Sequence, residues 1–175
     1  MSISSPAKHW WRSPLHKEEK MWVAIALVWC ILITVIMPVW HVVGEQNPPQ
    51  EYYRWDPADF DKLVDNFIEK YKVGEEEGVP VVEPPPNSDI FIRGQQFTWD
   101  PILKLKANQT YRLHLSSSDV NHGFSVYPIN MNFQAVPGWD SVLTITPTST
   151  GEFTIICNEF CGIGHHVMFG KIYVE

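Results

Sequence analysis

The sequence predicts an all-β sandwich with Greek-key connections, preceded by one membrane-spanning helix and one short helix outside the membrane. Two observations lead to this fold class. Residues 21–43 contain no Asp, Glu, Lys or Arg. Residues 89–175 alternate short β-rich runs with turn signals, which is typical of sandwiches. The 175 residues therefore leave room for one β domain of ordinary size, an anchor and a connecting segment.

Residues 21–43 form the predicted anchor. As a helix they would reach about 34 Å, enough to cross a hydrocarbon core of about 30 Å. Residues 1–20 hold four Lys or Arg against two Glu, so we expect this head in the cytoplasm and the rest of the chain on the periplasmic side. A cleaved signal peptide is the alternative, but the run is long and no Ala-x-Ala-like site follows it. We expect a single-pass protein of the cell (inner) membrane with no nucleic-acid partner.

Residues 44–88 are expected to be a linker that contains one helix. Residues 44–51 are polar and broken by prolines. Asp56 and Pro57 offer a helix N-cap and a first-turn proline, and apolar residues then recur on one helical face. This pattern predicts a helix over about 57–72. The proline run 84–86 is typical of an extended spacer before the last domain.

Residues 89–175 are expected to form the β domain. Pro137-Gly138 and Thr150-Gly151 are turn signals between the predicted strands. The β-rich or alternating runs are 89–99, 102–106, 111–115, 124–127, 141–146, 152–157 and 169–175. Strands this short and this closely spaced predict an antiparallel sandwich.

Four soft donors lie close together near the C-terminus. Cys157, Cys161, His165 and Met168 follow one another at spacings of four, four and three, a set that suits copper. One Cys with His and Met could hold a single copper, whereas two neighbouring thiolates can bridge two. A disulfide is an alternative because this domain would face an oxidising compartment, but it would explain neither His165 nor Met168. A Cys2His2 zinc site is another, although a thioether is a poor zinc ligand.

A fifth donor is expected from a loop at the same end of the sandwich. His122 lies in the turn-rich segment 118–124, which follows the predicted strand 111–115, and is the best candidate. We expect the remaining histidines to be structural or solvated: His9, His16, His41, His114 and His166.

The complete pattern resembles the copper A domain of cytochrome c oxidase subunit II over about residues 89–175, together with one preceding anchor. The motif is Cys157-Asn158-Glu159-Phe160-Cys161-Gly162-x-Gly164-His165-x-x-Met168, preceded by Asp119-x-x-His122 and Pro137-Gly138. The resemblance implies a cupredoxin-like barrel or sandwich that binds two copper ions. It implies that Cys157 and Cys161 are bridging thiolates and that His122 and His165 are terminal imidazole ligands. It also implies weak ligation by the thioether of Met168 and by the main-chain carbonyl of Glu159. Two bridging thiolates would let the coppers share one electron with little change in any bond.

Three features place the chain within this family. A single anchor resembles the B-type class of haem-copper oxidases, whereas most subunits II have two helices. Trp139 follows Pro137-Gly138, where two-helix members usually carry an arginine, so a haem-propionate contact is not carried over. Glu159 matches a position whose carboxylate helps to bind magnesium in many members, which makes magnesium a further hypothesis.

The resemblance implies a subunit through which electrons enter a respiratory oxidase. Cytochrome c would reduce the copper pair, which would pass the electron to haem in subunit I, where oxygen is reduced. Phe97 and Trp99 resemble the aromatic stretch near the copper and are candidates for the place where electrons enter, with strand packing as the alternative. Residues 44–175 hold nine Lys and Arg against eighteen Asp and Glu, a net charge of −9 that would attract a basic cytochrome.

Other functions remain open at this point. The same subunit could serve a haem-copper nitric oxide reductase, since the terminal chemistry takes place in another chain. A membrane-anchored copper-delivery protein is an alternative from a different class, although it needs exposed and exchangeable ligands. Nitrous oxide reductase carries a large propeller that this chain lacks, and quinol oxidase subunits II lack the copper ligands.

Overall fold

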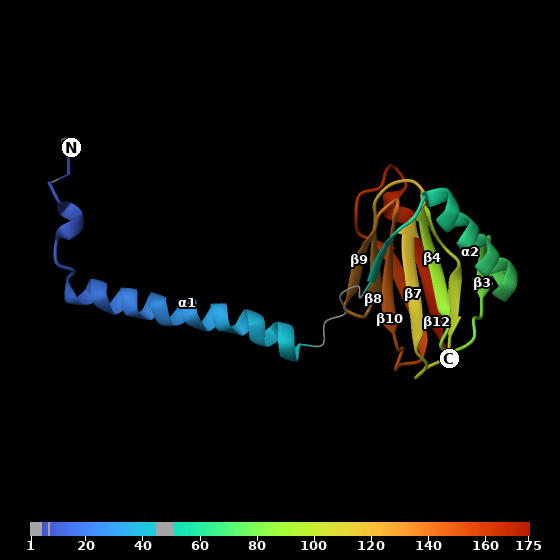
Figure 1. Cartoon of the computed structure of the whole chain (residues 1–175), viewed down its shortest axis with the longest axis horizontal. Coiled ribbons are helices and arrows are strands. Elements are labelled where there is room, and N and C mark those ends of the chain that lie inside the picture. The colour runs from blue at the N-terminus through green and yellow to red at the C-terminus, as the bar shows by residue number, and fades with distance from the viewer. Residues whose placement is uncertain (1–4, 7, 45–50) are drawn as a thin grey trace. The chain divides into compact units, whose positions relative to one another are not determined.

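The computed structural model describes residues 5–6, 8–44 and 51–175. The chain divides into two compact units, Met1–Gln46 and Asn47–Glu175 (Figure 1). Most of the expected polar exit from the membrane, residues 44–51, lies outside the described residues.

The first unit is built on the helix α1 (Lys17–Val43), which follows a short 3-10 turn, η1 (Trp10–Arg12). In the described part of the chain, α1 is the one helix long and apolar enough to cross a membrane, with a mean hydropathy of 2.6 and no buried residues. Its 27 residues reach about 40 Å. Glu18 and Glu19 lie in its first turn, where negative charge complements the helix dipole.

The second unit is a β-sandwich with one helix (Figure 1). The first sheet has the strand order β1-β10-β7-β4-β5 and the second the order β2-β3-β6-β12-β11-β8-β9. The strands are β1 (Glu51–Arg54), β2 (Lys72–Glu76), β3 (Val79–Val82), β4 (Asp89–Gln95), β5 (Thr98–Asp100), β6 (Ile102–Leu105), β7 (Tyr111–Ser117), β8 (His122–Tyr127), β9 (Met131–Ala135), β10 (Trp139–Ile145), β11 (Gly151–Cys157) and β12 (Phe169–Val174).

Both sheets are mixed, which differs from the antiparallel sandwich expected from the sequence. Three neighbouring pairs run parallel: β4 with β7, β6 with β12, and β3 with β6. The sequence pattern of a strand reports which faces are buried, but it does not report the direction of the neighbouring strand. The prediction of antiparallel pairing was therefore wrong for β4 with β7 and for β6 with β12, whereas β3 was not among the predicted strands.

The stretch expected to be a linker contributes three strands to the sandwich. β1 pairs with β10 at the edge of the first sheet, and the hairpin β2–β3 extends the second sheet through β6. Val82 is fully buried, and Pro84 from the proline run is buried as well. Residues 51–88 are thus largely part of the folded body and not a spacer.

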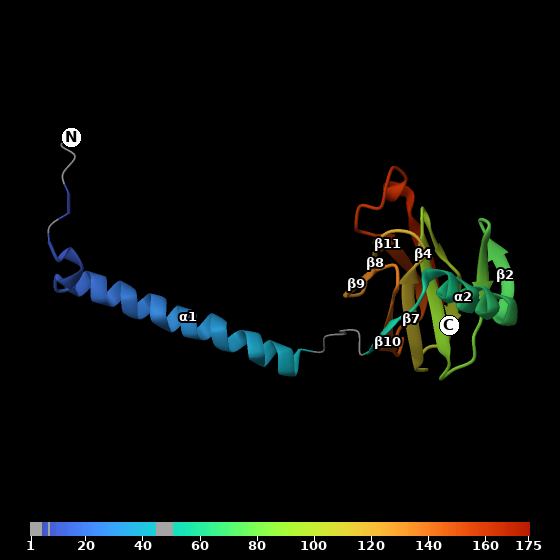
Figure 2. The ribbon, with the colours of Figure 1, turned by 45° about the horizontal axis from the view of Figure 1, so that its top comes forward.

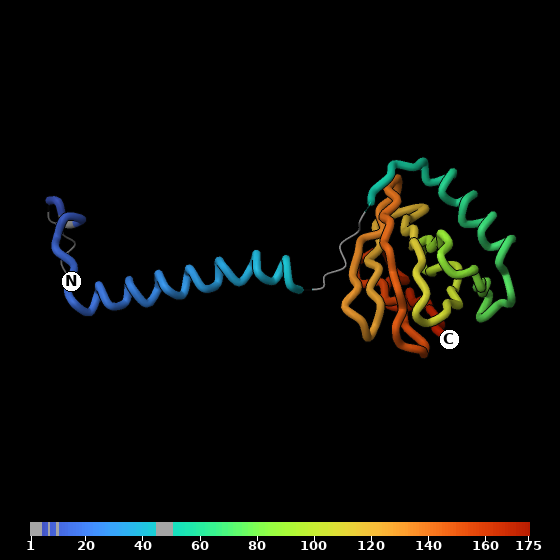
Figure 3. Tube along the Cα trace, turned by 60° about the horizontal axis from the view of Figure 1, so that its bottom comes forward, coloured from blue at the N-terminus to red at the C-terminus, as the bar shows by residue number. Residues whose placement is uncertain are grey.

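The helix α2 (Pro57–Tyr71) packs on the outside of the first sheet, as Figures 2 and 3 show. Asp56 caps it by accepting a hydrogen bond from the Ala58 N–H at 2.9 Å. Phe60, Val64 and Phe67 form its buried stripe. The two phenylalanine rings pack edge-to-face against Phe91 of β4, at centroid distances of 6.2 and 5.5 Å. The helix is therefore part of the same core.

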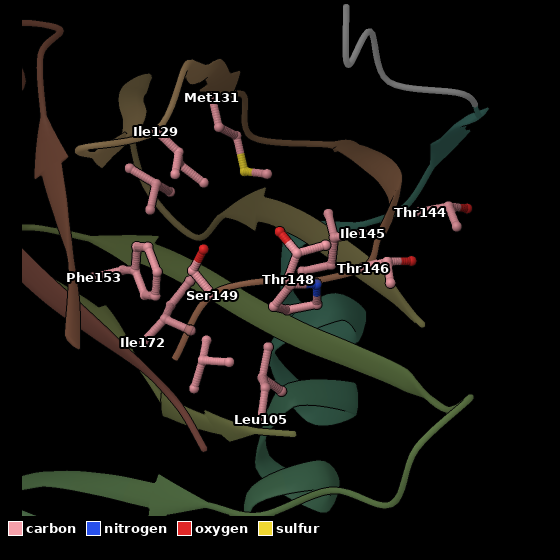
Figure 4. Close-up of a pocket in the computed structure, with 13 residues that line it drawn as sticks. Leu105, Ile129, Met131, Thr144, Ile145, Thr146, Thr148, Ser149, Phe153 and Ile172 are labelled. Carbon is pink, nitrogen blue, oxygen red and sulfur yellow. The ribbon is translucent and has the colours of Figure 1, made fainter. Parts of the chain in front are cut away.

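A cavity of about 440 Å³ opens between the sheets at one end of the sandwich (Figure 4). Apolar side chains such as Leu105, Met131, Phe153 and Ile172 line it, together with threonines of the segment 144–149. These residues lie where β8, β12 and β6 end and where β11 begins. The cavity is therefore at the opposite end from Cys157, the last residue of β11.

Candidate metal centre

Two adjacent strands bring the predicted donors to one end of the sandwich. His122 is the first residue of β8, Cys157 is the last residue of β11, and these strands pair antiparallel. The connection from Cys157 to β12 forms a loop with a short 3-10 turn, η2 (His165–Val167). The Cys157 N–H donates to the carbonyl of Met168 at 3.2 Å and closes the base of this loop. We call residues 158–168 the cysteine loop; it is the red loop at the top of the sandwich in Figure 1.

The two sulfur atoms lie side by side without a bond. The Sγ atoms of Cys157 and Cys161 are 3.7 Å apart, and both cysteines are free thiols. A disulfide would hold its sulfurs at about 2.05 Å. The distance instead suits two thiolates that share metal ions.

Each sulfur has its own imidazole. The Nδ1 atom of His122 is 3.9 Å from the sulfur of Cys157, and the Nδ1 atom of His165 is 3.7 Å from the sulfur of Cys161. The structure also brings Met168 Sδ to 3.7 Å from Cys161 Sγ. The carbonyl oxygen of Glu159 lies 3.3 Å from Cys157 Sγ. The other four predicted donor groups therefore lie around this one pair of sulfurs.

The donors differ in how deeply they are buried. His122 and Met168 are 0% exposed and the two cysteines 4% and 5%, whereas His165 is only half-buried. The ligand atoms of His122, Cys157 and Cys161 lie within 4.8 Å of one another, and His165 is not part of that compact group. Burial, and secondly the neighbouring thiol of Cys157, raise the pKa of the Cys161 thiol.

Asp119 holds His122 in the orientation that a metal needs. Its Oδ1 atom accepts a hydrogen bond from His122 Nε2 at 2.8 Å, so the proton sits on Nε2 and the Nδ1 lone pair faces Cys157. Burial opposes ionisation of Asp119, but hydrogen bonds from His122 and from the Gln96 and Val120 N–H groups lower its pKa overall. The carboxylate is therefore charged at neutral pH.

The two aromatic candidates for the place where electrons enter lie in different environments. Trp99 is 1% exposed, and its ring packs edge-to-face on His122 at 5.8 Å and on Phe124 at 5.3 Å. A side chain this buried cannot form a docking surface, which favours the alternative of strand packing for Trp99. Phe97 is half-buried, and its ring packs against the cysteine loop. The contact is close, since a Cβ placed on Gly164 would lie 2.4 Å from the ring.

The domain also matches a known protein family. Residues 91–174 match the family "Cytochrome C oxidase subunit II, periplasmic domain". A cytochrome c oxidase subunit 2 from Thermus thermophilus is 35% identical over 97 residues, which are 54% of this chain and 72% of that protein. The chain belongs to the cytochrome c oxidase subunit II family. The match to a second Thermus thermophilus cytochrome c oxidase subunit 2 spans 58% of that protein's length.

Solved structures confirm the cupredoxin-like fold of this subunit II chain. A chain from a heme-copper terminal oxidase dimer superposes with a TM-score of 0.54 and 24% identity, covering 91% of this chain and all of that one. Rusticyanin from Thiobacillus ferrooxidans, a copper protein, superposes with a TM-score of 0.52 and 16% identity, covering 73% and 99% of the two chains. Membership of this family implies copper binding, a partner subunit I and a membrane-anchored periplasmic domain.

The structure gives magnesium no support. The carboxylate of Glu159 meets Gln134 at 3.4 Å. Within the described residues, it belongs to no group of three or more His, Cys, Asp or Glu side chains that could share an ion.

Two of the histidines assigned no ligand role, His114 and His166, belong to the second unit. His114 bonds to the buried Asp140 at 2.7 Å and stacks on Phe91. His166 is exposed, although it adjoins His165. His9, His16 and His41 belong to the first unit.

Sequence reasoning assigned no role to two supporting residues, although it named Asp119 in the motif Asp119-x-x-His122. Asp119 is visible in the sequence as the acid three residues before His122, a spacing that could have suggested its hydrogen bond. Gln96 contacts the cysteine loop from 65 residues away, and no local pattern indicates it.

Proposed function

We propose that electrons enter a respiratory haem-copper oxidase through this subunit, at a binuclear copper A centre. The observation that carries the proposal is the pair of sulfurs 3.7 Å apart, each with its own imidazole nitrogen. When bound, a pair of copper ions would supply a one-electron relay. Cytochrome c would be the donor and a haem of subunit I the acceptor.

The arrangement of donors favours two ions over one. A single tetrahedral zinc would need four ligand atoms packed around one point. Here His122 belongs to the compact group with both sulfurs and His165 does not. Two copper ions would be held by Cys157 and Cys161 together with His122 and His165, which accounts for all four side chains. Met168 and the Glu159 carbonyl lie where they can act as weak additional ligands.

The chain's own residues would keep the centre rigid and mostly dry. Asp119 fixes the tautomer of His122, and Trp99 packs against its ring. Strands β11 and β12 hold the two ends of the cysteine loop. Ligands held this way move little on oxidation, and a small rearrangement is what fast electron transfer requires.

The surface over the centre suits a redox partner. Phe160 and Ile163 of the cysteine loop are 79% and 95% exposed, which gives an apolar area beside Cys161. The acidic excess of residues 44–175 would attract a basic cytochrome to the body of the subunit. We propose that α1 spans the membrane with the N-terminus in the cytoplasm, because the residues before it are basic.

The buried ligands weigh against copper delivery. A carrier must exchange its ion, whereas His122, both cysteines and Met168 are at most 5% exposed. A role in a nitric oxide reductase would use the same centre, and no observation favours it.

The test uses the full-length chain reconstituted with copper in detergent. We expect two copper ions per chain, a purple colour, and an EPR signal split by two equivalent copper nuclei. A colourless Cu(I) protein, or one bound ion per chain, would contradict the proposal. Stopped-flow reduction by cytochrome c, before and after assembly with subunit I, tests the assigned partners.

A further inference from the structure

The turn between β4 and β5 contacts the loop before His122 and also the cysteine loop. The Gln96 N–H donates to Oδ2 of Asp119 at 2.8 Å, and the other oxygen of Asp119 accepts from His122. The side-chain amide of Gln96 donates to the main-chain carbonyl of Cys161. One residue thus connects the loop before His122 with the cysteine loop.

The cysteine loop needs support from outside because part of its backbone is glycine. Gly162 has a φ of +135°, a conformation that side chains rarely adopt, and Gly164 follows two residues later. Glycine restricts the backbone least of all residues. The neighbouring Phe97 lies directly over both glycines, since a Cβ at Gly162 would be 3.2 Å from its ring and one at Gly164 would be 2.4 Å away.

We infer that Gln96 is a positioning residue for the metal centre. Its amide fixes the Cys161 peptide, its backbone N–H fixes Asp119, and through Asp119 it fixes the His122 imidazole. The Cys161 sulfur and the His122 imidazole are thereby held at a constant separation. This inference rests on the proposed two-copper centre, whose two halves must keep the same geometry when an electron arrives or leaves.

The decisive variant is Gln96→Glu in the full-length, copper-loaded chain. The side chain keeps its size and the backbone N–H stays in place, but a carboxylate cannot donate to the Cys161 carbonyl. We expect the two copper nuclei to become inequivalent in the EPR spectrum and the reduction potential to shift. We also expect copper affinity, measured by competition with a chelator at equilibrium, to fall about two- to tenfold, the change that one lost hydrogen bond produces.

Gln95→Glu is the matched control, because it adds the same charge at the adjacent position and its side chain makes neither contact. Its spectrum and copper affinity should match those of the wild type. If Gln96→Glu fails to fold, Gln96→Leu keeps the bulk without a donor and should show the same spectral change.

Two results would overturn the inference in distinguishable ways. If the wild type shows the two-copper spectrum and the Gln96 variants keep it, Gln96 positions nothing, even if their melting temperature falls. If the wild type itself lacks the two-copper spectrum, the proposed function fails and this inference fails with it.

Discussion

Oδ1 of Asp119 lies 2.8 Å from Nε2 of His122, and this contact decides which imidazole nitrogen is free. A carboxylate only accepts hydrogen bonds, so the Nε2 atom must carry the proton. The Nδ1 atom is then left with its lone pair directed toward Cys157.

Replacing this carboxylate should weaken the metal centre. In Asp119→Ala the imidazole loses its partner, and we expect copper affinity to fall about 10- to 100-fold, as for other supporting partners of ligand histidines. Competition with a chelator measures the change. Asp59→Ala, an exposed acid on α2, should leave the affinity unaltered. Equal affinities in the two variants would show that Asp119 does not support the ligand.

Metal uptake should depend on pH through the cysteines. Because the pKa of the Cys161 thiol is raised, copper must displace its proton, and affinity should rise up to tenfold per pH unit for each proton displaced. Titrations at pH 6, 7 and 8 measure this slope. A pH-independent affinity would mean that the thiol is already ionised.

The metal-free protein should show the opposite trend in stability. The raised pKa means that the folded state holds the Cys161 proton more tightly than the unfolded state does. The free energy of unfolding should therefore fall as pH rises above about 8.5, the ordinary thiol value, and continue to fall up to the folded pKa. Urea unfolding between pH 7 and 10 measures this, and Cys161→Ser should remove that part of the slope.

Filling the space under Phe97 should disturb the cysteine loop. A methyl group at Gly164 would collide with that ring, so we expect Gly164→Ala to lower the free energy of unfolding by about 1–3 kcal/mol. Gly74→Ala is the control, since nothing lies within 4 Å of its Cβ position. Chemical denaturation of both variants tests the contact, which would be disproved if they were equally stable.

The ion pairs between α2 and the sandwich should matter for stability. Arg93 contacts Asp100 at 2.8 Å, Asp65 at 3.0 Å and Asp61 at 3.4 Å, and its side chain is only 12% exposed. Arg93→Met leaves the 9% exposed Asp100 without a partner, and we expect a loss of about 3 kcal/mol.

The exposed pair of Lys62 with Asp59 provides the comparison. Lys62→Ala should change stability by less than about 1 kcal/mol. Near-UV circular dichroism in urea follows both variants. If Arg93→Met lowered the free energy of unfolding no more than Lys62→Ala does, the buried network would contribute no more stability than a surface pair.

Local sequence signals predicted the parts of the molecule that local interactions determine. The spacing from Cys157 to Met168 could be interpreted because one loop carries four donors. Asp56-Pro57 marked the start of α2 because capping is a contact between near neighbours. The cupredoxin-like fold and the family were confirmed by the comparisons.

Long-range contacts account for the rest. β1 has only four residues, three of them exposed, and becomes a strand by pairing with β10, so nothing within Glu51–Arg54 indicates it. Trp99 and Phe97 look alike in the sequence, but the packing of β5 buries one and leaves the other near the surface. The bond from Gln96 to the cysteine loop depends on the finished fold.

The cavity in Figure 4 has a consequence for where the sandwich opens first. It lies at the start of β11, and its lining residue Phe153 is four residues from Cys157, about 13 Å along the strand. Loosely packed ends have the lowest local unfolding free energies. Amide hydrogens at that end should exchange first, and such openings would leave the sulfurs and imidazoles at their distances. The domain can therefore fluctuate without altering the energy at which an electron is taken up or released.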